Sequence, residues 1–325
     1  MLTCKPKSLA ALAALFLTLC ATVTGSQAQD AWPSKPVRIV VPFAPGGSND
    51  VIARRLAQRL TTTLGQSVVV DNRPGGGSTV GAQSVATSAP DGYTLLFVSG
   101  SLATTAAVQT TPYDPVKAFE PISRVASAPF VIMTREGFPA KNVQELIAYA
   151  RQNPGKINYG SAGLGDSTQL ATELLSNTVG VKMTGVNYKG IAPAQMDMLA
   201  GRIDLVITTM ASVRGTAVEK LPMLAFTSAR RDPDFPNIPT VKESNIDYVV
   251  DVWWGLFGPA GLPAPIRDRM NREIASITAD KEFATFLKTA GAIPAPSTPE
   301  ALREAVAQDL ARWTETARRA GIQQK

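Results

Sequence analysis

The sequence contains no histidine, and its only two cysteines, Cys4 and Cys20, lie near the amino terminus of the 325-residue chain. A chain without histidine cannot use imidazole as a general base or as a zinc ligand. Beyond Cys20 it also offers no thiol nucleophile, no disulfide and no cysteine metal site. These absences exclude many enzyme mechanisms, and we expect the protein to bind no metal and no other cofactor.

A strong excess of charge is also missing. The chain carries 32 Lys and Arg residues against 26 Asp and Glu residues, a formal net charge of +6, and has no run of like charges. Nucleic-acid-binding proteins cluster basic side chains on one face, so we expect no nucleic-acid partner. A mild positive charge is compatible with binding small anions but does not require it.

The amino-terminal segment has the pattern of a secretory signal peptide. Lys5 and Lys7 precede the apolar run SLAALAALFLTLCATVTG, and small residues stand at Ser26–Ala28. We expect cleavage after Ala28, which lowers the net charge of the mature chain to +4. The uninterrupted apolar core is too short for a stable membrane anchor. A lipoprotein processed at Cys20 is the less favoured alternative, because Leu19 is large for a lipidation site.

Segments typical of strands and helices alternate along most of the remaining chain, which predicts an α/β fold with mostly parallel sheets. Two such series follow one another and predict two similar lobes, although no strict sequence repeat links them. We expect strands at 37–41, 68–70, 93–98, 130–134, 181–188 and 203–209, and helices at 51–64, 79–88, 142–152 and 191–201. The segment 113–126, marked by proline, is expected to be irregular.

The carboxy-terminal part is expected to be helical. Apolar residues recur at helical spacing in two stripes, and each stripe predicts a helix surface that faces the core. The stripes consist of Ile266, Met270, Ile274 and Ile277, and of Leu302, Val306, Leu310 and Trp313.

Three glycine-rich loops are candidates for binding an anion: Pro42–Asp50, Gly75–Gly81 and Gly160–Ser167. None ends in the Gly-Lys-Ser/Thr of a P-loop. The second loop resembles a dinucleotide fingerprint, but it stands four residues from its strand and lacks the expected acidic residue at a strand end. The first and third loops each follow a strand and open a helix, so each aims backbone N–H groups at one point.

Two such loops facing one cleft could bind an anion with micromolar affinity. Each helix terminus contributes roughly 0.3–1 kcal/mol and each charge-assisted hydrogen bond roughly 1.5–3 kcal/mol, against the ~8 kcal/mol that micromolar binding needs. The alternative is that the glycines only make tight turns. Asp50 is expected to cap its helix, while Asp166 either caps its helix or projects into the cleft. Trp253 and Trp254 are expected mainly to pack in the core or hinge.

Taken together, six segments resemble the Bug-type solute-binding proteins of tripartite tricarboxylate transporters, in order and spacing over nearly the whole mature chain. The segments are PFAPGGSNDVIAR, VVVDNRPGGGSTVGA, PDGYTLLF, NYGSAGLGDSTQLATELL, YKGIAPAQMDMLAGRIDLVI and WWGLFGPAGLPAPI. The resemblance implies a periplasmic, two-lobed binding protein of the Venus-flytrap type that closes on a small organic acid. It implies a first lobe of residues 29–126 and 251–325, and a second lobe of residues 127–250.

The resemblance also implies which residues hold the ligand. In the family, two strand-to-helix loops grip one carboxylate, and further contacts come from loops matching Ser99–Thr105 and Thr208–Ala211. The implied ligand-binding residues are Phe43, Ala44, Pro45, Gly46, Gly47, Ser99, Ser101, Gly160, Ser161, Ala162, Gly163, Gly165, Asp166, Ser167 and Thr209, with Asp50 supporting its loop. Family members commonly have a small hydroxyl residue near Asp166, so the acid here favours a ligand that also carries an amino or amide group.

The implied partners are a small carboxylic acid and either the permease subunits of a transporter or a sensor protein. We expect a monomer that is not an enzyme. The alternative is a secreted hydrolase that uses Asp50 and Asp166 as an acid–base pair, which the absence of histidine and cysteine does not exclude.

Overall fold

The computed structural model describes Met1 and residues 32–322. Every described helix and strand lies within the unit Lys35–Lys325. The predicted signal peptide, its cleavage after Ala28 and the alternative at Cys20 lie outside the described residues. No helix in the described part of the chain is long and apolar enough to cross a membrane.

The first sheet has six strands in the order β11-β4-β10-β3-β1-β2. β1 pairs in parallel with β2 and β3, whereas β10 and β11 run antiparallel to their neighbours. Its strands are β1 (Val37–Val41), β2 (Val68–Asn72), β3 (Thr94–Ser99), β4 (Phe119–Pro129), β10 (Asp251–Pro259) and β11 (Ile293–Pro294). The helices of this part are α2 (Ser48–Leu64), η1 (Gly76–Ser78), α3 (Thr79–Ala86), α4 (Ser101–Val108), α9 (Ala264–Ala279), α10 (Lys281–Thr289) and α11 (Pro299–Ala320).

The second sheet has five strands in the order β7-β6-β8-β5-β9. β6 is parallel to β7 and β8, and β5 is antiparallel to β8 and β9. Its strands are β5 (Val131–Thr134), β6 (Asn158–Ser161), β7 (Thr184–Asn187), β8 (Leu205–Thr208) and β9 (Met223–Phe226). The helices of this part are α5 (Val143–Gln152), α6 (Ser167–Val179), α7 (Ile191–Leu199), α8 (Met210–Val213), η2 (Ala217–Lys220) and η3 (Lys242–Ser244).

The predicted α/β class is confirmed, but the expectation of mostly parallel sheets is wrong. Both sheets are mixed, because the strands around the crossings between them run antiparallel to their neighbours. The chain passes from β4 to β5 at Phe130 and returns between β9 and β10. Thr227 joins the two crossings: its hydroxyl accepts from the Phe130 N–H at 2.8 Å, and its carbonyl accepts from the Val250 N–H at 3.1 Å.

Several elements differ from the sequence-based expectation: besides β4 and α4, strand β9 and the short helix α8 were not predicted. Most of the segment expected to be irregular belongs to the eleven-residue strand β4. Its Pro121 is tolerated because β11 covers only the distant end of β4, so this part of the strand has a partner on one side only. Helix α4 was not predicted, because it is buried on nearly every side and therefore has no amphipathic pattern.

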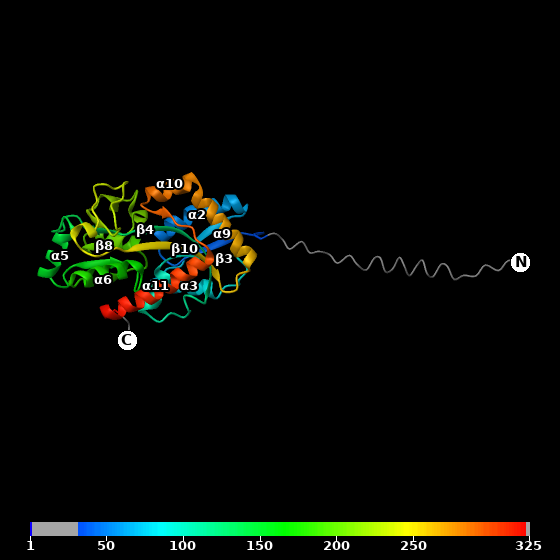
Figure 1. Cartoon of the computed structure of the whole chain (residues 1–325), viewed down its shortest axis with the longest axis horizontal. Helices are drawn as coiled ribbons and strands as arrows, with labels where there is room; N and C mark the ends of the chain where they lie inside the picture. The colour runs from blue at the N-terminus through cyan, green and yellow to red at the C-terminus, as the bar shows by residue number, and fades with distance from the viewer. Residues whose placement is uncertain (2–31, 323–325) are drawn as a thin grey trace. The chain divides into compact units, whose positions relative to one another are not determined.

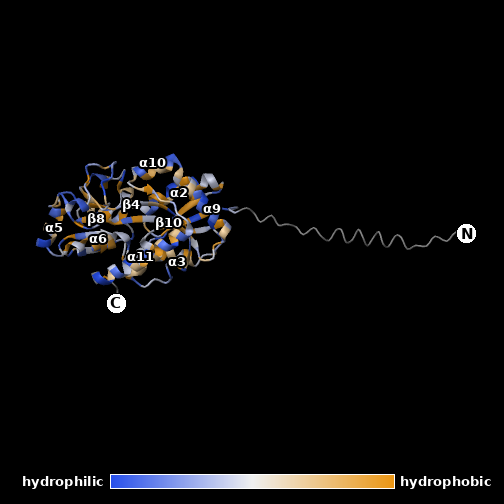
Figure 2. Ribbon diagram, viewed as in Figure 1, coloured by the Kyte–Doolittle hydropathy of each residue, from blue (hydrophilic) through white to orange (hydrophobic). Residues whose placement is uncertain are grey.

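The core is built as the periodic patterns predicted. Met270, Ile274 and Ile277 are buried on α9, and Leu302, Val306 and Trp313 are buried on α11, while Ile266 and Leu310 are partly exposed. Figure 2 shows hydrophobic residues concentrated on the strands, with hydrophilic residues on outer helices such as α5. Burial of these apolar faces stabilises the fold by roughly 25 cal/mol per Å² of apolar surface removed from water.

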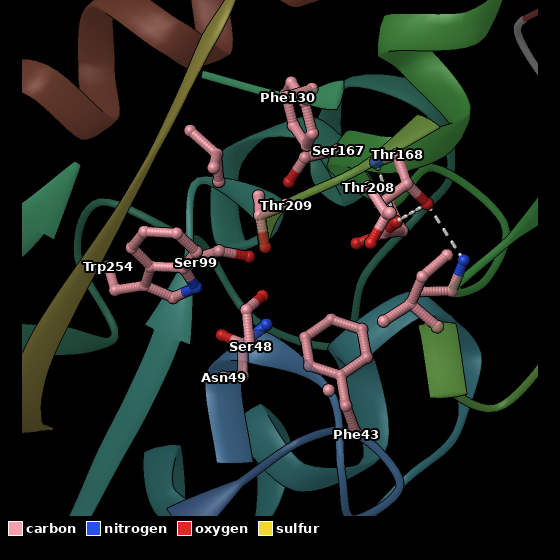
Figure 3. Close-up of a pocket in the computed structure, with 15 residues that line it drawn as sticks. Phe43, Ser48, Asn49, Ser99, Phe130, Ser167, Thr168, Thr208, Thr209 and Trp254 are labelled. Carbon is pink, nitrogen blue, oxygen red and sulfur yellow. Dashed lines mark hydrogen bonds between the residues drawn. The ribbon is translucent and has the colours of Figure 1, made fainter. Parts of the chain in front are cut away.

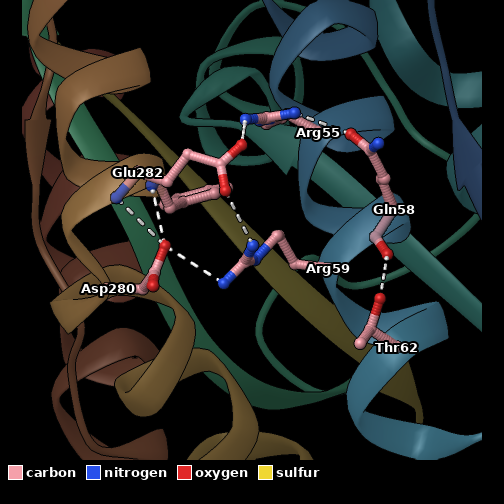
Figure 4. Close-up of polar contacts among 7 residues, drawn as sticks. Arg55, Gln58, Arg59, Thr62, Asp280 and Glu282 are labelled. Atoms are coloured by element: carbon pink, nitrogen blue, oxygen red, sulfur yellow. Dashed lines mark hydrogen bonds and ion pairs between the residues drawn. The ribbon is translucent and has the colours of Figure 1, made fainter.

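Residues from opposite ends of the chain meet at helices α2 and α10. Figure 1 shows α9 and α10 in orange beside α2 in blue. Arg59 of α2 pairs with Asp280 and with Glu282, at 3.1 Å in each case, and Arg55 also pairs with Glu282 (Figure 4). These pairs are partly exposed, so each adds little stability, and together they link α10 and its N-cap Asp280 to α2.

Candidate functional site

A cavity of about 30 Å³ lies between loops of the two sheets (Figure 3). The first sheet and its loops contribute Phe43, Gly47, Ser48, Asn49, Ser99, Val252 and Trp254. The second sheet and its loops contribute Ala162, Asp166, Ser167, Thr168, Ile191, Thr208 and Thr209, and Phe130 lines the cavity from the crossing between the sheets. None of these lining residues is a lysine or an arginine.

The loop between β1 and α2 presents the amino terminus of a long helix to the cavity. Gly47 is the N-cap residue, and no side chain caps the helix there, so N–H groups of the first turn remain available. Asp50 shapes the loop, because its carboxylate accepts from the Gly46 N–H at 3.0 Å and pairs with Arg54 at 2.9 Å. Gly46 has a φ of +88°, a conformation that favours glycine.

The loop between β6 and α6 places Asp166 at the opposite wall. Its carboxylate caps α6 by accepting from the Thr168 N–H at 2.8 Å, and it also accepts from the hydroxyl groups of Thr168 and, at 2.7 Å, Ser101. Asp166 therefore both caps its helix and lines the cavity. Burial raises the pKa of this carboxyl group above its usual range, and the hydrogen bonds from Thr168 and Ser101 oppose that rise.

Serine hydroxyl groups connect the two walls next to Asp166. Ser101 of α4 lies 2.8 Å from the hydroxyl of Ser99 and 2.8 Å from the hydroxyl of Ser167. Ser99 and Ser101 belong to the first sheet and its loops, and Ser167 begins α6 of the second. The chain of hydroxyl groups therefore ties the two sheets together behind the cavity.

Three polar side-chain atoms at the cavity have no hydrogen-bond partner: the Trp254 indole nitrogen, the Thr209 hydroxyl oxygen and the Asn49 amide oxygen. Trp254 is 0% exposed. Figure 3 shows Ser48, Ser99, Thr209 and Trp254 turned toward a common space. Since most buried polar groups in proteins are hydrogen-bonded, this concentration makes the cavity a candidate binding site for a polar molecule.

The sequence-based site residues fall into two groups. Seven of them line the cavity: Phe43, Gly47, Ser99, Ala162, Asp166, Ser167 and Thr209. The others do not line it: Ala44, Pro45, Gly46, Ser101, Gly160, Ser161, Gly163 and Gly165. Ser101 lies behind Asp166, to which its hydroxyl donates. Gly163 packs against the backbone of Gly77, and neither glycine has room for a side chain.

Eight lining residues were absent from the predicted set: Ser48, Asn49, Phe130, Thr168, Ile191, Thr208, Val252 and Trp254. Ser48 and Asn49 belong to the candidate loop Pro42–Asp50, and their place directly after Gly46 and Gly47 could have indicated that they line the cavity. Thr208 lay within a loop that the family resemblance implied. No sequence signal distinguishes Trp254 from an ordinary core aromatic residue.

The described residues contain no group of three or more Asp, Glu, His or Cys side chains that could hold a metal ion. The second acidic residue of the hydrolase alternative, Asp50, is not among the lining residues. The geometry therefore brings together neutral donors and one buried carboxylate rather than a pair of acids.

Comparison with known proteins identifies the family of the chain. The model of the tripartite tricarboxylate transporter family receptor matches residues 52–322. The solved structure of the periplasmic binding protein BugD is 35% identical with a TM-score of 0.86, and the match covers 90% of this chain and 100% of BugD.

Two further structures were solved with acids bound. Rpa4515 of R. palustris with adipate is 34% identical, with a TM-score of 0.85 and coverage of 89% of this chain and 98% of its own. MatC (Rpa3494) of Rhodopseudomonas palustris with bound malate is 30% identical, with a TM-score of 0.83 and coverage of 88% and 99%. These proteins are solute-binding proteins and not enzymes. The chain belongs to the tripartite tricarboxylate transporter receptor family, as a Bug-type solute-binding protein.

Proposed function

We propose that this protein is a periplasmic receptor that binds a small carboxylic acid in the cavity between its two sheets. One observation carries the proposal: the uncapped amino terminus of α2 and unpartnered polar side chains converge on a cavity without lysine or arginine. Backbone N–H groups at a helix terminus bind anions well. Adipate and malate in the related structures support a carboxylate as the ligand class.

Ligand entry in this proposal requires the two lobes to separate. A cavity of about 30 Å³ has room for only two or three water molecules, at roughly 10–15 Å³ each, which is less than an organic acid needs. From the sequence we expect residues 29–126 and 251–325 in one lobe and residues 127–250 in the other. Because β4 keeps residues 127–129 in the first sheet, we propose that the hinge lies at the crossings near Phe130 and Val250. Ligand affinity then includes the free energy of closing the lobes.

The partner in this proposal is the permease of a tripartite tricarboxylate transporter, which receives the acid from the closed receptor. A sensor protein that recognises the same closed form is the second candidate. The family description supports the permease. We further propose that the mature chain begins after Ala28 and works as a monomer.

The proposal is tested with the mature protein, purified without refolding. Native mass spectrometry identifies any acid that remains bound, and calorimetry with malate, adipate and related acids measures affinity. We expect at least one acid to bind with micromolar affinity or better and to be recovered chemically unchanged. Failure of every carboxylate to bind would reject the receptor, and conversion of the acid to a product would favour the hydrolase.

A further inference from the structure

We propose that the indole N–H of Trp254 donates a hydrogen bond directly to an oxygen of the bound acid. This inference rests on the proposed function, because it assigns one contact within the same cavity. The sequence predicts a packing role for Trp254, but packing does not explain why its buried indole nitrogen has no hydrogen-bond partner.

Two adjacent tryptophans on β10 have different hydrogen-bonding states. Successive side chains of a strand point to opposite faces of the sheet. Trp253 reaches α11, where its indole N–H donates to the Asp309 carboxylate at 2.8 Å. Trp254 faces the cavity, is fully buried, and its indole nitrogen has no partner.

An unpaired buried donor is costly, and proteins rarely retain one. The indole N–H can only donate, so its partner has to be an acceptor such as a carboxylate or carbonyl oxygen and cannot be an ammonium group. Figure 3 shows the Trp254 nitrogen turned toward the side of the cavity where Ser48 and Asn49 begin α2. The indole and the helix terminus therefore offer donors to the same anionic group.

The opposite wall completes the arrangement. Thr209, which is 3% exposed, has an unpartnered hydroxyl at the cavity. A hydroxyl can donate or accept, so it can bind a second polar group of the ligand. The fixed donor Trp254 thus orients the carboxylate, and Thr209 faces the remainder of the molecule.

The test compares Trp254→Phe with Trp253→Phe as the matched control, using whichever of malate and adipate binds the wild-type protein. Losing a hydrogen bond to a charged oxygen is expected to weaken binding by about 10- to 100-fold in Trp254→Phe. Trp253→Phe loses its bond to Asp309 and is expected to unfold at a lower temperature while keeping ligand affinity within about twofold. Equal affinity of Trp254→Phe and wild-type protein would overturn the inference.

A spectroscopic measurement separates a ligand contact from a packing role. In ¹⁵N-labelled protein, the indole N–H resonance that disappears in Trp254→Phe is expected to move downfield on adding ligand, whereas that of Trp253 stays in place. If Trp254→Phe does not fold, benzothienylalanine at position 254 keeps the ring shape without the N–H and is expected to show the same loss of affinity. An unmoved Trp254 resonance rejects the contact. A wild-type protein that binds no carboxylate rejects the proposed function itself, and the inference with it.

Discussion

Gly77 is the position where a single methyl group should prevent the two sheets from approaching each other. A Cβ atom at Gly77 would lie 2.0 Å from the backbone oxygen of Leu164, which belongs to the loop between β6 and α6. Ordinary contacts of this kind are 3.4 Å or longer. Gly77→Ala therefore requires the loops to separate by more than about 1 Å.

The expected loss of binding free energy follows from the hydrogen bonds that this separation of the loops would break. Gln109 donates to the carbonyls of Gly76 at 2.9 Å and of Leu164 at 3.2 Å, so it joins the same two loops. Losing one or two such bonds costs about 1–3 kcal/mol. If ligand binding requires this arrangement, the dissociation constant of Gly77→Ala should rise by about 5- to 150-fold, since 1.4 kcal/mol corresponds to a factor of ten.

The matched control is Gly65→Ala at the end of α2. Gly65 has a φ of +70° and Gly77 a φ of +66°, but a Cβ at Gly65 would have no neighbour within 4 Å. Both variants therefore carry the same backbone strain, about 1–2 kcal/mol, and should unfold at lower temperature than wild type. Only Gly77→Ala should bind malate or adipate more weakly, in calorimetry, and scatter X-rays as a more open particle. If Gly77→Ala matches Gly65→Ala in both affinity and scattering, the reasoning is wrong.

Three further predictions concern the carboxylates and the serine next to the cavity. Burial raises the pKa of Asp166 above 3.8, so between the two pKa values the folded protein holds a proton that the unfolded chain releases. The free energy of unfolding should therefore fall as pH rises from about 3.8 through the folded-state pKa. Urea titrations of Asp166→Asn at several pH values should lack this fall. Ser101→Ala removes a donor to Asp166 and should lower the free energy of unfolding by about 1–3 kcal/mol in urea; an unchanged value would show that the bond contributes nothing. Asp50→Ala removes the hydrogen bond to the Gly46 N–H, so the free energy of unfolding should fall by about 1–2 kcal/mol and ligand affinity should decrease. A wild-type affinity in calorimetry would show that Asp50 does not support the loop for binding.

Much of the fold could be predicted because alternating strand and helix patterns are local. The strand at Val37–Val41 was placed at its observed bounds, and the core stripes of α9 and α11 were identified from their spacing. Strand β4 could not be identified in this way, because its prolines are acceptable only at an edge, and edges are set by which strands pair. Helix α4 was missed for a different reason: it is buried on nearly all sides, so its sequence lacks the apolar periodicity that identifies a helix.

The glycine loops of the candidate site could be predicted from the sequence, whereas the side chains left without a hydrogen-bond partner could not. Loops after β1 and β6 were recognised from strand, glycine and helix in sequence. The difference between Trp253 and Trp254 is invisible in the sequence, since it depends on Asp309 of α11 lying beside only one of them. Two glycines of the predicted site, Gly163 and Gly165, instead let the loop after β6 pack closely against Gly77 and Thr105.

The absence of lysine and arginine from the cavity wall has a consequence for the environment in which the protein works. Mobile ions screen attraction between full charges in solvent, but they act weakly on enclosed dipoles and short hydrogen bonds. A receptor built in this way should hold its cargo about equally well in dilute and in saline surroundings. Selectivity then depends on where lone pairs point rather than on how much charge the cargo carries.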